Sequence, residues 1–231
     1  MVDVPTHRQE PFGVRAGART TQRRGRMSAG KATALAELAP TWMIDGDAAA
    51  DPARLDEAFG RRAPRLLDIG AGTGEATRQH AIDHPDQDVV AVELHRPGMV
   101  RLVRDLDRDG PASVRVVEAD ALALIDRAPP GTYHHVRALF PDPWPKRRHV
   151  GRRMVNPAFV RAVADLIPVG GTLHLATDWE DYAEQMRACL RTDRRLGPAS
   201  EERPPRPVTA YEQRGIDAGR TIVDLVATRV S

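Results

Sequence analysis

Short apolar runs alternate with longer amphipathic segments through most of this 231-residue chain. Five of the runs are short enough to be strands buried on both faces of a sheet, and they occupy residues 65–69, 89–94, 114–117, 135–140 and 172–176. A β-branched run at residues 221–230 suits a last strand, with an antiparallel edge position possible. The alternation is typical of βαβ units. It therefore predicts an α/β fold with a doubly wound, mostly parallel sheet and helices on both faces.

Prolines and capping residues predict where the helices begin and end. Pro52, Pro97 and Pro157 suit the first turn of a helix, where an absent N–H costs nothing. Pro40 is expected to end a helix over residues 32–38. Three more helices are expected, at residues 75–84, 121–126 and 179–190.

Composition fits one domain preceded by an arm. Residues 1–26 lack hydrophobic periodicity and contain six arginines, which predicts a flexible basic arm ahead of a folded domain over residues 27–231. Such an arm could tether RNA electrostatically or be an inert tail, and the composition leaves both open. The formal net charge is only +2, so nucleic-acid affinity would depend on where the cations gather.

The sequence gives no indication of a disulfide, a metal site or a membrane segment. Cys189 is the single cysteine, so we expect no internal disulfide, and no Cys/His spacing predicts a metal site. We find no apolar run of signal-peptide or membrane-span length. A cytoplasmic protein without membrane association is expected.

Acidic residues lie at or just past the ends of five successive predicted strands. These residues are Asp68, Glu93, Asp120, Asp142 and Asp178. Ligands of open α/β sheets bind outside the carboxyl ends of the strands. The pattern therefore predicts a ligand site at that edge, lined by carboxylates.

A glycine-rich turn after the first strand predicts a nucleoside-containing cofactor. Gly70, Gly72 and Gly74 permit a tight turn and close approach of a ligand to the backbone at a helix N-terminus. Glu93, at the end of the next strand, can accept hydrogen bonds from ribose hydroxyls. A dinucleotide such as NAD and S-adenosylmethionine both fit these features.

Three details favour S-adenosylmethionine. The glycines are spaced Gly-x-Gly-x-Gly rather than Gly-x-Gly-x-x-Gly. An acid at Asp68 would repel a pyrophosphate but suits an amino group and a sulfonium cation. Asp120 can accept a hydrogen bond from an adenine amino group. Each acid could also have a purely structural role. Asp68 or Asp120 could cap a helix, and Glu93 could pair with His95 or Arg96.

The stretch at residues 138–149 combines an acid, an aromatic ring and a basic cluster. Pro141 and Pro143 stiffen the backbone on either side of Asp142. Trp144 follows, as a stacking surface or as an anchor beneath the loop. The cations after it are Lys146, Arg147, Arg148, Arg152 and Arg153. Together they suggest a nucleobase carried on a polyanion, whereas the plainer alternative is a Pro-rich loop with a solvated basic face.

These segments closely resemble the bacterial tRNA (guanine-N(7)-)-methyltransferase family, over about residues 23–230. The resemblance rests on residues 67–74, 140–149 with Arg152 and Arg153, 176–179 and 206–215. It implies a Rossmann-like class I methyltransferase sheet and methylation of a guanosine in the variable loop of tRNA, with S-adenosylmethionine as donor. A monomer or homodimer is expected.

The resemblance also implies roles for individual residues. Asp142 would be the catalytic residue at the reaction centre. The donor would be bound by Asp68, Gly70, Gly72, Gly74, Glu93, Asp120 and Asp142. The tRNA would be bound by Lys146, Asp178, Thr209, Ala210, Tyr211 and Glu212. Asp68 stands where the family usually has Glu and Ala71 where it has a bulkier residue, while a glutamine expected near Lys31 is absent.

Guanine N7 has an in-plane lone pair and no proton, so its methylation requires no general base, and catalysis is then mostly positioning. This agrees with a predicted site that is rich in acids and lacks an evident nucleophile. Three alternatives remain at this stage: a methyltransferase for another substrate, a non-catalytic RNA-binding module, and a dinucleotide oxidoreductase.

Overall fold

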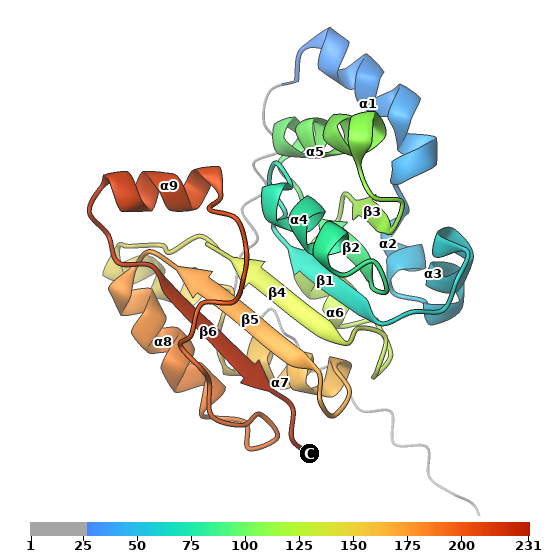
Figure 1. The fold of residues 1–231 in the computed structure, drawn as a ribbon. Helices are drawn as coiled ribbons and strands as arrows, with labels where there is room; N and C mark the ends of the chain where they lie inside the picture. Colours follow the sequence, from blue (N-terminus) through green and yellow to red (C-terminus); the bar gives the residue numbers. More distant parts are fainter. Residues whose placement is uncertain (1–26) are drawn as a thin grey trace, which may run out of the picture.

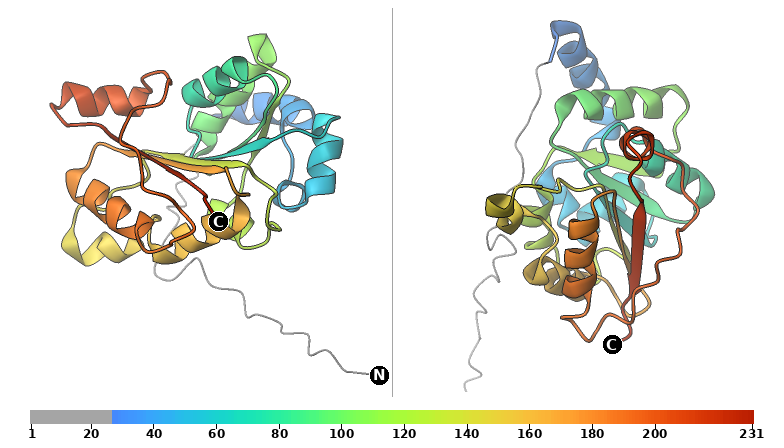
Figure 2. Two further views of the ribbon diagram at one scale, coloured as in Figure 1. Left: turned by 60° about the horizontal axis from the view of Figure 1, so that its bottom comes forward. Right: turned by 90° about the vertical axis from the view of Figure 1, so that its left-hand side faces the viewer.

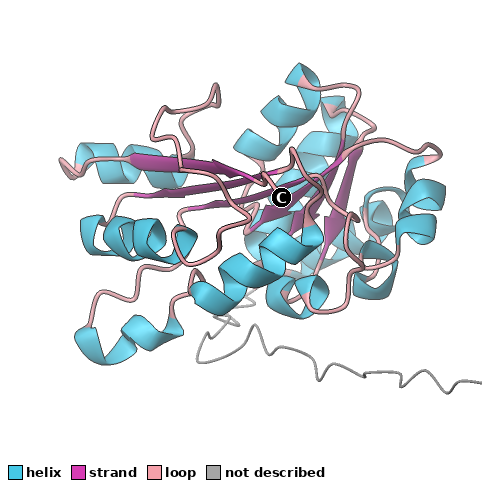
Figure 3. Ribbon diagram, turned by 90° about the horizontal axis from the view of Figure 1, so that it is seen from below, coloured by secondary structure: helices cyan, strands magenta, loops and turns pink. Residues whose placement is uncertain are grey.

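The computed structural model describes residues 27–231, which form a six-stranded sheet between two layers of helices (Figures 1 and 3). The strand order is β3-β2-β1-β4-β5-β6. The strands are β1 (Arg65–Ile69), β2 (Asp88–Val92), β3 (Val114–Val117), β4 (His135–Leu139), β5 (Thr172–Thr177) and β6 (Val223–Thr228). All neighbours pair in parallel except β5 and β6, which are antiparallel. The predicted α/β class is confirmed, whereas the predicted arm, residues 1–26, lies outside the described residues.

Each face of the sheet carries its own hydrophobic cluster. On one face the strands pack against α1 (Ala29–Trp42), α4 (Glu75–Asp83) and α5 (Arg96–Asp109). On the other face they pack against α2 (Gly46–Ala49), α3 (Pro52–Phe59), α6 (Ala121–Ile125), α7 (Pro157–Leu166) and α8 (Glu180–Leu190). Strand residues alternate between the two clusters, with Leu66 in the first and Leu67 in the second. This alternation fixes the register of every strand.

The last helix, α9 (Ala210–Asp217), lies on the same side of the sheet as α4 and α5 (Figure 2). Under it β4, β5 and β6 present polar rather than apolar side chains, namely Arg137, His174 and Asp224. The C-terminal segment is therefore held on the sheet by ion pairs, as described below.

Several helix boundaries agree with the sequence predictions. Helix α3 runs from Pro52 to Phe59, and Asn156 caps α7 by accepting a hydrogen bond from the Phe159 N–H at 3.0 Å. The structure also contains α2, α9 and a 3-10 helix, η1 (Arg147–Arg152), which were not predicted. None of the helices in residues 27–231 has the length and apolar character that a bilayer crossing needs.

The predicted end of the first helix at Pro40 is wrong. Pro40 lies inside α1, which continues to Trp42, and the Met43 N–H still bonds the Ala39 carbonyl at 2.8 Å. Leu35 and Leu38 pack against the cluster that contains Trp42. Burial of this apolar face outweighs the one backbone hydrogen bond that proline removes.

Candidate active site

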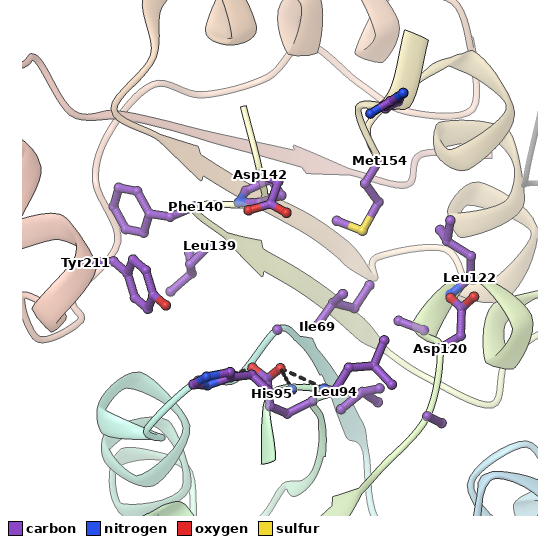
Figure 4. Close-up of a pocket in the computed structure, with 18 of the residues that line it drawn as sticks. Ile69, Leu94, His95, Asp120, Leu122, Leu139, Phe140, Asp142, Met154 and Tyr211 are labelled. Carbon is purple, nitrogen blue, oxygen red and sulfur yellow. Dashed lines mark hydrogen bonds between the residues drawn. The ribbon is translucent and has the colours of Figure 1, made fainter. Parts of the chain in front are cut away.

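A cavity of about 490 Å³ opens at the carboxyl ends of the central strands, where the acids were predicted to gather (Figure 4). Three carboxylates line it: Glu93, Asp120 and Asp142. The rest of the lining is largely apolar or aromatic, and includes Ile69, Leu94, Leu122, Leu139, Phe140, Trp144, Met154 and Tyr211. Such a mixture of apolar walls with a few polar groups is typical of a small-molecule site.

The glycine turn forms one wall of this cavity. Gly70 and Gly72 line it, and both have positive φ angles, of 72° and 60°. Gly74 serves a different purpose, because a Cβ there would lie 2.2 Å from Leu102 Cδ1. Two of the predicted glycines thus bring backbone to the cavity, and the third allows α4 to pack closely on α5.

Glu93 is held rigidly just beyond the end of β2. One of its carboxylate oxygens accepts a hydrogen bond from the Gly72 N–H at 2.8 Å, and the other accepts from the N–H groups of Leu94 and His95 at 2.7 and 2.6 Å. The alternative ion pair with Arg96 does not form, since Arg96 contacts Glu118 at 2.7 Å. Glu93 therefore joins the glycine turn to the next strand and presents a fixed acceptor to the cavity.

Asp120 combines both of the roles that the sequence left open. Its Oδ1 atom accepts a hydrogen bond from the Leu122 N–H at 3.0 Å and so caps α6, while the residue also lines the cavity. Capping fixes the carboxylate at the wall of the cavity.

The loop that carries Asp142 is strained and braced. Phe140 and Trp144 have positive φ angles, of 53° and 42°, which L-residues with large side chains rarely adopt. Such strain costs of order 1–3 kcal/mol per residue and persists only where surrounding contacts impose it. Here Arg153 Nε donates to the Pro143 carbonyl at 2.8 Å, directly behind Asp142. The loop thus places Asp142 at the cavity in a fixed backbone conformation.

The inclusion of Arg153 among the cations that would face a polyanion is wrong. Its side chain is 1% exposed, and its guanidinium contacts Asp181 at 2.6 Å and Gln185 at 2.8 Å, both on α8. Arg153 is therefore a buried side chain whose hydrogen bonds connect the Asp142 loop to α8. Trp144 is half-buried and lines the cavity, with the Arg152 guanidinium 5.1 Å from its ring centroid and the His149 ring edge-on at 5.7 Å. The exposed cations of η1 and its N-cap are Lys146, Arg147 and Arg148.

The predicted substrate residues other than Lys146 lie on or beside α9, and among all of them only Tyr211 lines the cavity. Figure 4 shows its ring beside Phe140. Thr209 caps α9 by accepting from the Glu212 N–H at 3.2 Å. Asp178 accepts from Arg220 at 2.6 Å, and a Cβ on Gly215 would lie 2.9 Å from its Oδ2 atom. Ala210 is the first residue of α9, and Lys146 lies outside the cavity on the exposed surface.

Glu212 is fully buried in a network of ion pairs that fastens α9 to the sheet. It bonds Arg203 and Arg206, and Arg206 also donates to Asp224 on β6 at 2.9 and 3.0 Å. His174 Nε2 lies 2.7 Å from Asp224 Oδ1. We call these five residues the C-terminal ion-pair network. Sequence reasoning missed it, although ionisable residues such as His174 and Asp224 within otherwise apolar strands are a signal of buried partners.

The network predicts a dependence of stability on pH. Burial raises the pKa of Glu212 and Asp224, but hydrogen bonds and charges from Arg203, Arg206 and His174 outweigh it and hold each pKa below its ordinary value of 4.5 or 3.8. Depressed carboxyl pKa values stabilise the fold fully above those ordinary values, and the stabilisation is lost as pH falls through the folded values. We expect the melting temperature, followed by circular dichroism, to fall on acidification below about pH 4.5. It should fall less steeply in Glu212→Gln, and parallel curves would contradict this assignment.

Comparison with known proteins agrees with this geometry. A family model described as "Putative methyltransferase" matches residues 62–225. A tRNA (guanine-N(7)-)-methyltransferase of Alkalilimnicola ehrlichii is 45% identical over 210 residues, which are 88% of this chain and 89% of that protein. The protein of the same name from Halorhodospira halophila is 42% identical, with 89% of this chain and 91% of that protein covered.

Solved structures support the fold at much lower identity. An antibiotic-related methyltransferase superposes with a TM-score of 0.56 at 17% identity, and the 16S rRNA methyltransferase KamB with 0.55 at 15%. Each covers 78% of this chain and 94% of the matched one. At this identity the likeness concerns the fold alone, and it confirms the predicted methyltransferase sheet. The fold agrees with the two relatives of 45% and 42% identity, and these relatives show that the chain belongs to the tRNA (guanine-N(7)-)-methyltransferase family.

Proposed function

We propose that this protein transfers a methyl group from S-adenosylmethionine to N7 of a guanosine in the variable loop of tRNA. The observation that carries the proposal is the cavity, in which Glu93, Asp120 and Asp142 come from the ends of three different strands and converge beside a glycine turn. Close relatives that cover most of the chain are named for the same activity.

The residues of the cavity fit the methyl donor. Glu93 presents a carboxylate for the ribose hydroxyls at the end of β2, with backbone bonds that keep it in place. Asp120 offers an acceptor for the adenine amino group, between the apolar side chains of Ile69 and Leu122. Three carboxylates at one cavity also favour a cationic sulfonium over a pyrophosphate, which they would repel. The donor supplies a methyl group that is already activated by the positive charge on sulfur.

Asp142 and Tyr211 lie where the purine would enter. The N7 lone pair attacks the methyl carbon, the carbon–sulfur bond breaks, and its electron pair stays on sulfur, so that positive charge passes to the purine. Asp142 can accept hydrogen bonds from the guanine edge and stabilise that charge as it builds. Tyr211, 58% exposed and next to Phe140 in Figure 4, offers a face on which the base can stack.

The proposed activity is tested by identifying the methylated nucleoside. The protein is incubated with labelled S-adenosylmethionine and unmodified tRNA, the RNA is digested, and the labelled nucleoside is identified by chromatography. We expect 7-methylguanosine from the variable loop. Label in another nucleoside, or labelled small molecules without labelled RNA, would contradict the proposal.

The exposed cations at η1 predict a salt-dependent affinity for tRNA. Replacing Lys146 by Ala should weaken tRNA binding and reduce the slope of log affinity against log salt by about one for each lost phosphate contact. Arg62→Ala is a suitable control, because that side chain is 90% exposed on the connection that enters β1, at the opposite end of the strands. Filter binding at several salt concentrations measures both slopes. Equal slopes in the two variants would show that Lys146 does not contact the RNA.

A further inference from the structure

Asp68, predicted to contact the donor, is instead enclosed in the protein. Its side chain is 4% exposed and does not line the cavity, although its neighbours Ile69 and Gly70 do. Arg137 donates to both of its carboxylate oxygens, from Nε at 3.0 Å and from Nη2 at 2.7 Å. The Thr77 hydroxyl donates to Oδ2 at 2.6 Å. Three donors thus hold the carboxylate on the face of the sheet that carries α4.

These bonds join the two ends of the glycine turn. Asp68 lies two residues before Gly70, and Thr77 lies in the first turn of α4, which begins directly after Gly74. The hydrogen bond between them therefore closes the loop formed by the turn at its base. Thr77 is completely buried, so water cannot substitute for either partner.

Arg137 connects this closure to the Asp142 loop. It is the register partner of Asp68 in the parallel pair β1 and β4, and its strand runs directly into the loop that begins at Phe140. Its side chain is 6% exposed. The ion pair thus ties together the two strands whose ends carry the glycine turn and Asp142.

The ionisation states of Asp68 and of the groups around it are also well defined. Burial raises the pKa of Asp68, but the charge and hydrogen bonds of Arg137, with the Thr77 hydroxyl, outweigh it and keep the carboxyl ionised. Burial and the neighbouring Arg137 lower the pKa of His80 to about 4, so His80 is neutral near pH 7 and leaves Arg137 as the cation that balances Asp68.

We propose that Asp68, Arg137 and Thr77 form a clamp that positions the glycine turn for the methyl donor, and that Asp68 acts through the turn without touching the donor. The inference rests on the proposed function in taking that donor as the ligand. It reassigns Asp68 from a donor-binding residue to a positioning residue. Donor contact then falls to the residues that line the cavity.

Donor affinity, measured without RNA, distinguishes the clamp from direct contact. Titration calorimetry with S-adenosylhomocysteine would compare the parent with Arg137→Gln, Thr77→Val, Asp68→Asn and the double variant Asp68→Asn with Arg137→Gln. The clamp predicts that Arg137→Gln and Asp68→Asn each weaken binding by about tenfold or more, and that the smaller change Thr77→Val weakens it by about threefold or more. The double variant should bind no more weakly than either single variant, because the two residues act as one unit.

Arg65→Gln is the matched control. Arg65 is a buried arginine at the other end of β1, paired with Asp56, and the same substitution there should lower the melting temperature while leaving donor affinity within about twofold. Parent-like affinity in both Arg137→Gln and Thr77→Val, with loss only in Asp68→Asn, would overturn the clamp and restore direct contact. Failure of the parent to bind S-adenosylhomocysteine would instead contradict the proposed function. Thr77→Val removes a single hydrogen bond, so the test holds even where Arg137→Gln does not fold.

Discussion

Methyl transfer to tRNA is expected to fall by about 100-fold or more when Asp142 is replaced by Asn, while tRNA affinity stays within about threefold of the parent. Asn keeps the shape of the side chain but removes the negative charge that the developing positive charge on the purine requires. The braced loop around it, held by Arg153, should be unchanged. Single-turnover rates with saturating donor measure the effect, since they separate the chemical step from product release.

Asp217→Asn is the control for this variant. Asp217 is an exposed acid at the end of α9 that accepts a hydrogen bond from Gln213 Nε2 at 2.8 Å, so its replacement removes the same charge close to the site without touching the cavity. Its rate should match that of the parent. An unchanged rate in Asp142→Asn would show that this acid is not at the reaction centre, and a loss confined to tRNA affinity would assign it to RNA capture.

Replacing Arg206 by Gln is expected to lower the free energy of unfolding by about 3–5 kcal/mol, because it leaves two buried carboxylates without their shared cation. Glu212 is fully buried and Asp224 is 3% exposed, so water cannot take the place of the guanidinium. Arg206 itself is 3% exposed. Urea unfolding followed by circular dichroism gives the free energy, and activity should fall with it because α9 carries Tyr211.

Arg187→Gln provides the comparison. Arg187 also contacts several acids, but Glu180, Glu184 and Glu201 are each more than half exposed. Exposed pairs contribute about 0–1 kcal/mol, so this variant should unfold almost as the parent does. Similar losses in the two variants would mean that burial of the network does not decide its contribution.

Much of the fold could be predicted from local signals in the sequence. Pro52 and Pro157 mark helix starts because proline costs nothing in a first turn, and Asn156 caps α7 as its side chain allows. The helix end predicted at Pro40 was wrong because tertiary packing, and not a local signal, decides where α1 ends. Leu35 and Leu38 pack against the core, and nothing in the sequence around Pro40 indicates that packing. Helix α9 was missed because the network that fastens it to the sheet includes His174 on β5, which is far from α9 in sequence.

The residues of the site also differ in how far the sequence predicts them. The convergence of Glu93, Asp120 and Asp142 follows from the rule that parallel strands end at one edge, so it could be predicted before any coordinates. The environments of Asp68 and Glu212 could not. Arg137, the partner of Asp68, lies 69 residues away in sequence. Arg206 lies close to Glu212 in sequence, but the burial of this pair depends on the contact of Arg206 with Asp224 on β6. One signal was available: an arginine at position 137 inside an apolar strand needs a buried acid as partner.

A crystal structure of the protein with S-adenosylhomocysteine is the most direct measurement of the central claim, that carboxylates at the ends of β2 and β4 hold the donor beside the entering purine. We predict ribose hydroxyls within hydrogen-bonding distance of Glu93, the adenine amino group near Asp120, and the sulfur atom directed toward Asp142. A nucleoside bound outside this cavity, or bound inside it with the sulfur directed away from Asp142, would contradict the account.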